Sequence, residues 1–456
     1  MYRNYRNAVT CQSSPKSIEG GSSPRGEVWA VRGATLYCCT IHDAPPKVRF
    51  LPRVLSEQHS LSHPPLPCQR PTSSRMKVVT AGVGLRAGHV LAIMKEKMPE
   101  IEFVGYHDPQ PAFLSKIGED VPPFDSVEEM LRETKPDLFF VGSPNNFHLE
   151  HIKAGLAAGV RVFTEKPVVI SEQETLELAA LLKEHGPDRV MVGLVLRYSK
   201  HMSDLRAVLG QLGPVVSLEA NEHIGPYHGA FFMRDWRRLS KLSGGFMLEK
   251  CCHDLDIFNM MTGSRPVKVA SFGGKKSYLP EYAPAPETKE DGIMHTKESV
   301  WKGVDDAFRS DSDIIDHQTA ILQFETGASM AFHTNLNVPD EHRRFCVMGA
   351  RGMIEGDFVR GYLKATLRDG SVIADHDYND LDEAKKAAHY GADDLMVADV
   401  AAFLRGEAIE LPVGIVDALE AGLVAIALDK ARVSGEMVDL SETWAAFDAF
   451  GLSGST

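Results

Sequence analysis

The fold of this chain is indicated most clearly by the stretch Lys77-Val-Val-Thr-Ala-Gly-Val-Gly-Leu-Arg-Ala-Gly-His89. It begins as a largely apolar run typical of a buried strand, continues into the pattern G-x-G-x-x-A, and leads to a helical pattern through Met98. Gly82 permits a tight turn, Gly84 lets the backbone approach a pyrophosphate, and Ala87 lets the helix pack close to the strand. The sequence therefore predicts a strand, a phosphate-binding loop and a helix N-terminus in direct succession.

Length and composition indicate a globular protein of two or three domains. A chain of 456 residues with 43% hydrophobic and 24% charged residues is too long for a single core. Its net charge of −13 argues against a nucleic-acid partner. No stretch approaches the roughly 20 consecutive apolar residues of a membrane helix, so no membrane partner is expected. Seven cysteines without a signal peptide do not form a disulfide framework, so we expect a cytoplasmic protein.

Residues 1–75 differ from the rest of the chain. They hold 9 of the 26 prolines and 4 of the 7 cysteines, and they carry 10 basic against 4 acidic residues. No helical or strand periodicity persists in them, apart from a short possible strand near residues 27–31. We expect a disordered or spurious N-terminal extension, with the functional chain beginning at Met76. A basic, serine-rich transit peptide is the alternative.

The acidic residue that follows the second predicted strand bears on the choice of cofactor. This strand, 101–107, ends at Asp108, which lies 26 residues beyond Gly82. A carboxylate at about this distance accepts hydrogen bonds from the adenosine ribose hydroxyls. It would repel a 2′-phosphate, so NAD is favoured over NADP. The alternative for Asp108 is a turn residue that precedes Pro109.

Strands and helices continue to alternate through residue 196. Further strands are expected at 137–142, 161–164 and 189–196, and helices at 126–133 and 149–158. Asn146 is expected to cap the second of these helices. The alternation predicts a parallel, doubly wound sheet, in which ligands bind at the carboxyl ends of the strands. The residues predicted to lie at those ends are Gly82, Asp108, Ser143–Asn145 and Lys166.

The second half, from Tyr198, shows a different pattern. A helix is expected at 202–212, and strands follow that are joined largely without helices. These strands are expected at 215–221, 267–272, 316–324, 329–335, 344–348 and 353–355, with later helices at 394–405 and 414–434. The pattern predicts an antiparallel or mixed sheet. The polar stretch 282–313 is either a lid over a pocket or a surface insertion.

A helix-like stretch at 247–261 carries Glu249 and His253 four residues apart, on one helix face. A carboxylate there can orient the imidazole while its other ring nitrogen meets a substrate. One alternative is an exposed, salt-bridged helix face. Another is a metal site that includes Cys251 and Cys252. Adjacent cysteines on a helix point in different directions, so no metal is expected.

From Met76 to its C-terminus, the chain resembles the Gfo/Idh/MocA oxidoreductases. The matching motifs are Ala81-Gly-Val-Gly-Leu-Arg-Ala-Gly-His89, Ser143-Pro-Asn-Asn-Phe-His148, Glu165-Lys-Pro167, Gly193-x-x-x-Arg197-Tyr198, Gly244-Gly245 before the acid-x-x-x-His pair, and Gly391-Ala-Asp393-Asp394. The resemblance implies a Rossmann domain over 76–197, followed over 198–456 by a substrate-binding and oligomerisation α/β domain with a largely antiparallel open sheet. A further implication of the resemblance is that the C-terminal helices pack back on the Rossmann domain. It also implies NAD or NADP, a sugar, polyol or inositol substrate, and a homodimer or homotetramer.

The resemblance also implies roles for individual residues. Lys166 would lie near the nicotinamide and the substrate hydroxyl, and its bond to Pro167 is sometimes cis in such proteins. His253 would be the acid/base, with Glu249, in place of the usual aspartate, as its orienter or a substrate contact. The expected cofactor-binding residues are Gly82, Gly84, Leu85, Arg86, Asp108, Ser143, Asn145, His148, Glu165 and Lys166. The expected substrate contacts are Arg197, Tyr198, Trp236, Glu249 and His253, with Glu222, His223, Tyr227, Asp235 and His317 as further candidates.

These roles give a hydride-transfer hypothesis. His253, directly or through Lys166, removes the hydroxyl proton while hydride passes to NAD⁺. Lys166 either acts as the base or stays charged and stabilises the developing alkoxide. Two alternatives remain open: an NAD-dependent glycoside-cleaving enzyme that oxidises its sugar transiently, and a catalytically silent NAD-binding regulator.

Overall fold

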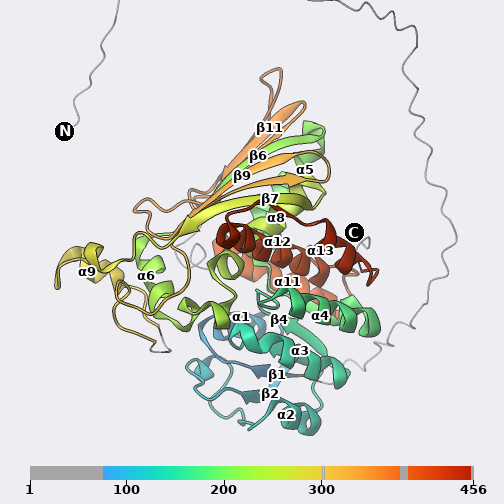
Figure 1. The fold of residues 1–456 in the computed structure, drawn as a ribbon. Coiled ribbons are helices and arrows are strands. Elements are labelled where there is room, and N and C mark those ends of the chain that lie inside the picture. Colours follow the sequence, from blue (N-terminus) through green and yellow to red (C-terminus); the bar gives the residue numbers. More distant parts are fainter. Residues whose placement is uncertain (1–74, 300, 302, 381–388, 453–456) are drawn as a thin grey trace, which may run out of the picture. The chain divides into compact units, whose positions relative to one another are not determined.

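The computed structural model describes residues 75–299, 301, 303–380 and 389–452. The extension expected at 1–75 therefore lies outside the described residues, apart from Arg75. The described residues belong to one compact unit that holds two sheets (Figure 1). In this part of the chain, no helix is long and apolar enough to cross a membrane. The same residues contain no group of three or more His, Cys, Asp or Glu side chains that could hold a metal ion.

The first sheet is parallel and has five strands in the order β2-β1-β3-β4-β5. Its strands are β1 (Met76–Ala81), β2 (Ile101–His107), β3 (Leu138–Val141), β4 (Arg161–Thr164) and β5 (Val190–Val192). They alternate with α1 (Leu85–Lys97), α2 (Val127–Thr134), α3 (His148–Ala157) and α4 (Glu172–His185). The predicted doubly wound sheet is confirmed. Its strand order reverses between β1 and β3, where such sheets bind ligands.

Two local predictions in this half are wrong. Asn146 does not cap α3, because a 3₁₀ turn at Asn145–Phe147 precedes the helix and Phe147 occupies the N-cap position. The strand expected at 189–196 is shorter, because Val195–Tyr198 form another 3₁₀ turn. Both turns follow the carboxyl end of a strand, where the chain changes direction toward the ligand-binding edge of the sheet.

The second sheet has nine strands in the order β13-β12-β11-β10-β6-β9-β8-β7-β14. The strands are β6 (Val215–His223), β7 (Pro266–Gly274), β8 (His317–Phe324), β9 (Ser329–Asn335), β10 (Arg344–Gly349), β11 (Gly352–Asp357), β12 (Tyr362–Leu367), β13 (Val372–Asp377) and β14 (Val438–Asp439). Only β6 and β9 pair in parallel, so the expected largely antiparallel sheet is confirmed. Alternate residues of β8 are buried, which gives this sheet one covered face.

Helices cover one face of this sheet and reach the first one (Figure 1). The helices of this half of the chain are α5 (Lys200–Leu209), α6 (Pro226–Arg234), α7 (Ser240–Ser243), α8 (Phe246–Thr262), α9 (Lys289–Met294), α11 (Ala392–Arg405), α12 (Ile415–Ser434) and α13 (Ser441–Asp448). Of these, α6 and α9 contact each other and lie beyond the end of the sheet (Figure 1). α8 packs against α12 and β6, α12 also contacts α4 and β5, and α11 contacts α1. The two layers therefore meet beside the carboxyl edge of the parallel sheet.

Candidate active site

A cavity of about 740 Å³ borders both layers. All ten residues expected to bind the cofactor line it, together with Asp235, Trp236, Glu249 and His253. Residues more than 150 positions apart in the sequence thus meet in one space, which is large enough for an elongated ligand.

The glycine-rich loop forms one end of the cavity through its main chain. Gly82 has φ +88°, and a Cβ on it would lie 2.5 Å from the carbonyl oxygen of Gly142, so only glycine fits. Gly84 is the N-cap of α1 without a side-chain cap, and a Cβ there would meet only the Trp301 Nε1 at 3.9 Å. The main-chain amides at this helix end therefore remain open to the cavity, as a pyrophosphate requires.

Asp108 connects the end of β2 to this loop. Its Oδ2 accepts a hydrogen bond from the Val83 amide at 2.6 Å, and its Oδ1 accepts one from the Gln110 amide at 2.7 Å. The carboxylate also lines the cavity. Each carboxylate oxygen has a second lone pair, so Asp108 keeps the capacity to accept from ribose hydroxyls.

Arg86 ties the first helix to the C-terminal helices at the cavity wall. Its Nε donates to the Glu165 Oε1 at 3.0 Å, and its Nη1 donates to the Asp393 Oδ1 at 2.6 Å. The Arg86 Nη2 and the Glu165 Oε2 are buried and have no hydrogen-bond partner within the described chain. Unsatisfied polar atoms on two lining residues fit a bound polar ligand, which would supply the missing partners.

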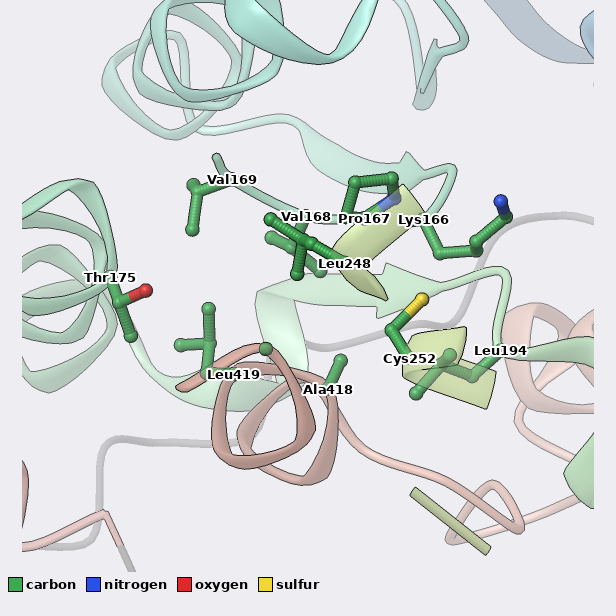
Figure 2. Close-up of a pocket in the computed structure, with 11 residues that line it drawn as sticks. Lys166, Pro167, Val168, Val169, Thr175, Leu194, Leu248, Cys252, Ala418 and Leu419 are labelled. Atoms are coloured by element: carbon green, nitrogen blue, oxygen red, sulfur yellow. The ribbon is translucent and has the colours of Figure 1, made fainter. Parts of the chain in front are cut away.

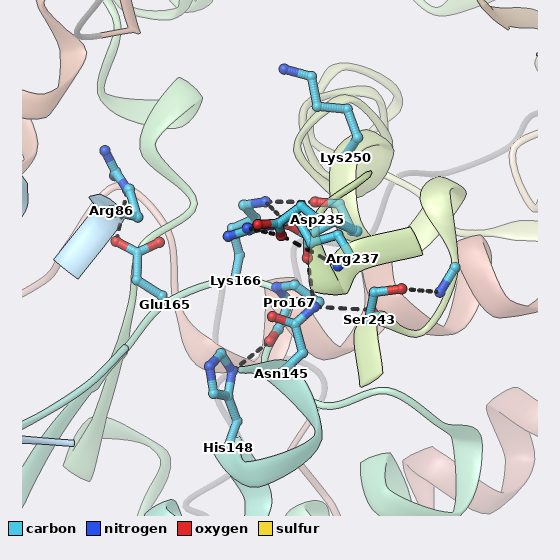
Figure 3. A network of polar contacts seen from close by, with 12 residues as sticks. Arg86, Asn145, His148, Glu165, Lys166, Pro167, Asp235, Arg237, Ser243 and Lys250 are labelled. Carbon is cyan, nitrogen blue, oxygen red and sulfur yellow. Dashed lines mark hydrogen bonds and ion pairs between the residues drawn. The ribbon is translucent and has the colours of Figure 1, made fainter. Parts of the chain in front are cut away.

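A second part of the cavity wall is a polar network in which Lys166, Arg237 and Asn145 (Figure 3) contact Glu249. The Lys166 Nζ donates to the carbonyl oxygen of Glu249 at 2.5 Å and lies 3.5 Å from its Oε1. The Arg237 Nε donates to the same Oε1 at 2.9 Å, and the Asn145 Nδ2 donates to the Oε2 at 2.5 Å. Burial acts to raise the pKa of Glu249, but the charges of Lys166 and Arg237 hold it below its ordinary value. Glu249 is therefore an ionised anchor for Lys166.

His253 lies one turn further along α8 and lines the same cavity. Burial, together with the charge of Lys166, lowers the pKa of His253 well below its ordinary value. Its Nδ1 is buried and has no hydrogen-bond partner among the residues that the structure describes. The expected orientation of His253 by Glu249 is not observed, because Arg237, Asn145 and Lys166 occupy the Glu249 oxygens. The imidazole is thus neutral at pH 7 and able to accept a proton.

The backbone that carries Lys166 is fixed from two sides. The His148 Nδ1 lies 2.8 Å from the carbonyl oxygen of Pro167 (Figure 3), and its Nε2 lies 2.8 Å from that of Ser143, so this side chain bridges two loops. The Lys166–Pro167 bond is cis. A small, mainly apolar pocket behind the turn is lined by residues of α8 and α12, among them Leu248 and Leu419 (Figure 2). His148 therefore positions Lys166 through the main chain.

The structure does not bring Arg197 and Tyr198 to the cavity, which corrects their expected contact with substrate. The Arg197 Nε and Nη2 each lie 2.8 Å from an oxygen of Asp256, and its Nη2 lies 3.4 Å from Asp417. These ion pairs join the segment after β5 to α8 and α12, so Arg197 is a buried structural tie. Other candidates that do not line the cavity are Glu222, His223, Tyr227 and His317.

Several cavity residues were not predicted from the sequence. These residues are His228, Arg237, Lys250, Lys297, Trp301 and His389. Their side chains match no motif, so no sequence signal distinguished them from solvated residues. Lys297 and Trp301 come from the polar stretch 282–313, and their position beside the cavity favours the lid interpretation over a surface insertion.

Comparisons with known proteins agree with this architecture. Two models of the Gfo/Idh/MocA oxidoreductase family match, its NAD-binding Rossmann fold at residues 76–194 and its C-terminal alpha/beta domain at 206–440. The putative oxidoreductase YteT of Bacillus subtilis is 28% identical over 306 residues, which are 58% of this chain and 67% of that protein. D-glucoside 3-dehydrogenase of Escherichia coli is 28% identical over 251 residues, 50% of this chain and 68% of that protein.

A solved structure has the same fold. Scyllo-inositol dehydrogenase from Lactobacillus casei, with bound NAD(H) and scyllo-inositol, is 18% identical, with a TM-score of 0.61 over 81% of this chain and 100% of that one. Across four curated oxidoreductases, the chain spans 41% to 68% of the relative's length. The two family models together cover most of the chain. The chain therefore belongs to the Gfo/Idh/MocA oxidoreductase family, and NAD is the cofactor of its Rossmann domain.

Proposed function

We propose that the protein is a dehydrogenase that transfers a hydride between NAD and a hydroxyl-bearing carbon of a sugar, polyol or inositol. One observation carries the proposal: Lys166 and His253, two groups able to hold a hydroxyl proton, line the same cavity as the glycine-rich loop. The similarity to a D-glucoside dehydrogenase and the fold of an inositol dehydrogenase support the substrate class.

Each residue has a distinct part in this proposal. NAD, when bound, supplies the hydride acceptor in its nicotinamide ring. The open amides at Gly84 would hold the pyrophosphate, and Asp108 would hold the ribose. Lys166, anchored on Glu249, stabilises the substrate oxygen as its proton leaves. His253 is neutral and accepts that proton on its imidazole ring.

The proposal extends to the setting of the protein. We propose a cytoplasmic homodimer or homotetramer formed through the uncovered face of the second sheet. Phe272 and Ile321 lie on the neighbouring strands β7 and β8 and are 72% and 62% exposed, which supports self-association there. Cys251, Cys252 and Cys346 are free thiols, which supports a reducing compartment. Light scattering on the purified chain would measure the oligomeric state.

The test is to mix the full chain with NAD⁺ and a panel of inositols, aldoses and disaccharides, and to follow the absorbance of NADH. We expect NADH to accumulate with at least one compound, and Lys166→Met and His253→Asn each to abolish it. Lys183→Met, which changes an exposed lysine of α4, is the matched control and should leave the rate unchanged.

Three other outcomes would contradict the proposal. An unchanged rate in Lys166→Met or His253→Asn would remove that residue from the reaction. Release of a free sugar from a disaccharide, without accumulation of NADH, would indicate glycoside cleavage by transient oxidation. Binding of NAD, measured by calorimetry, with no turnover of any compound would indicate a regulator.

A further inference from the structure

Lys297 differs from the other cations of the cavity in having no acidic partner. Lys166 pairs with Glu249, Arg237 pairs with Glu249 and Asp235, and Lys250 lies 3.1 Å from an oxygen of Glu222. Lys297 forms no ion pair within the described part of the chain. Its Nζ contacts an imidazole and an aromatic ring instead.

Both contacts of Lys297 come from α6. Its Nζ lies 3.0 Å from the His228 Nε2 and 4.6 Å from the centroid of the Phe231 ring. Burial, followed by the nearby charge of Lys297, lowers the pKa of His228 well below its ordinary value, so this imidazole is neutral. A neutral imidazole and a ring face can orient an ammonium group, but neither balances its charge.

Two further cations near Lys297 add to the positive charge that no acidic group of the described chain balances. Burial, followed by the charges of Lys250 and Arg237, lowers the pKa of Lys297 to about 7, while Glu341 and Asp235 act in the opposite direction. A partly buried cation beside two other cations is unfavourable unless an anion neutralises it. An anionic ligand group at this place would supply the missing charge.

We propose that Lys297 binds an anionic group carried by the substrate, a carboxylate or a phosphate, so that the substrate class is an acidic sugar or polyol. This inference rests on the proposed function. Lys250 and Arg237 would add to the attraction, since both line the same cavity and both act on Lys297. The pyrophosphate of NAD is expected at the glycine-rich loop beside Gly82 and Gly84, and the affinity of Lys297→Met for NAD tests whether Lys297 contacts the cofactor instead.

The test compares matched compounds that differ only in charge: glucose, glucuronate and glucose 6-phosphate, with the corresponding galactose set. Affinity for the NAD-loaded full chain is measured by calorimetry, and kcat/KM by NADH absorbance. The variants are Lys297→Met, which removes the charge, and Lys297→Arg, which keeps it. Lys289→Met, in the exposed helix α9 of the same segment, is the control.

We expect an acidic compound to bind about 10- to 100-fold more tightly than its neutral counterpart, the range for a charge-assisted hydrogen bond. Lys297→Met should remove most of this preference and leave the affinities for the neutral sugar and for NAD unchanged, while Lys297→Arg should keep most of it. The preferred member of each set distinguishes a carboxylate from a phosphate.

The inference is overturned if no acidic compound binds better than its neutral counterpart, or if Lys297→Met weakens both equally. Weaker binding of NAD in Lys297→Met would assign the lysine to a cofactor phosphate and also overturn it. Failure of the proposed function has a separate signature. In that case the acidic compound binds through Lys297, but no NADH forms from any member of the sets.

Discussion

The two ends of the cavity are built in different ways. The glycine-loop end depends on main-chain geometry: the positive φ of Gly82, the uncapped start of α1 at Gly84, and the bond from the Val83 amide to Asp108. The α8 end depends on side chains from separate segments, in which Glu249 holds Lys166 and Arg237 by charge. Backbone amides would therefore bind a ligand at the first end, and titratable side chains would contact it at the second.

This difference predicts separate roles for the two ends in cofactor binding and in proton transfer. Backbone amides cannot change their protonation state, so the glycine-loop end binds without taking part in proton transfer. Side chains at the α8 end can gain, lose or stabilise charge. We therefore expect substitutions at the α8 end to act mainly on kcat, and substitutions at the glycine-loop end to act mainly on the KM for NAD.

The largest effect is expected for Lys166→Met. Removing the amine deprives the substrate oxygen of its nearest charge, and kcat should fall about 10³-fold, within the range for a proton-handling group. The affinity for NAD, measured by calorimetry, should change little. If the affinity for NAD falls together with kcat, Lys166 contributes to both cofactor binding and the reaction, and the proposed separation of the two roles is wrong.

A smaller loss is expected for Glu249→Gln. The amide keeps the shape of the side chain but removes the charge that holds Lys166 and Arg237, so kcat should fall about 10²-fold. Steady-state kinetics would measure this effect, with the exposed Glu184→Gln of α4 as the control. A change confined to the KM for NAD would place Glu249 with the cofactor instead.

Asp108→Asn tests the glycine-loop end. The amide still accepts the bond from the Val83 amide, but it binds ribose hydroxyls less strongly and no longer repels a 2′-phosphate. We expect the KM for NAD to rise about tenfold, the discrimination against NADP to decrease, and kcat to stay within about twofold. A large fall in kcat with unchanged cofactor binding would show that Asp108 acts in the reaction and not in binding NAD.

The smallest effect is a pH dependence at the α8 end. Because the pKa of Lys297 is lowered to about 7, the amine is charged below that pH and becomes neutral as the pH rises through it. The groups that face it are His228, Lys250, Arg237, Asp235 and Glu341. The KM for an acidic substrate should therefore rise severalfold between pH 6 and pH 8.

Lys297→Arg separates this titration from others in the cavity. A guanidinium stays charged over the whole range, so the KM of this variant should be nearly independent of pH. The same rise in the variant would show that another group is responsible.

Much of the fold could be predicted because buried parallel strands are continuous apolar runs. The largely buried parallel strand β4 begins and ends at the predicted residues, as do β2 and the strand β9, whose residues alternate between exposed and buried. The helix α4 was not predicted, and neither were strands such as β12, whose residues alternate between buried and partly exposed without a strong apolar pattern. Local pattern is informative where apolar residues form a continuous run or alternate strictly, and weak where, as in β12, the buried face is not strongly apolar.

The residues of the site likewise fall into those that could be predicted from the sequence and those that could not. Gly82, Gly84 and Asp108 could be predicted from the sequence. The glycines belong to a turn motif that only glycine fits, and Asp108 is a carboxylate at the end of a predicted strand. Arg237 and Lys297 could not be placed, because an isolated basic residue looks solvated until its tertiary neighbours are known. Motif membership was misleading for Arg197, whose partners Asp256 and Asp417 lie 59 and 220 positions away.

The most direct test of hydride transfer in this cavity is an isotope experiment. The best compound of the panel would carry deuterium on the carbon that bears the reacting hydroxyl, and the NADH formed by the full chain would be analysed by mass spectrometry. A dehydrogenase that works as proposed transfers the deuterium to NADH, and the wild type and Lys183→Met give the same labelled product. Unlabelled NADH, or deuterium that stays in the sugar while no reduced cofactor accumulates, would contradict direct hydride transfer from substrate to NAD.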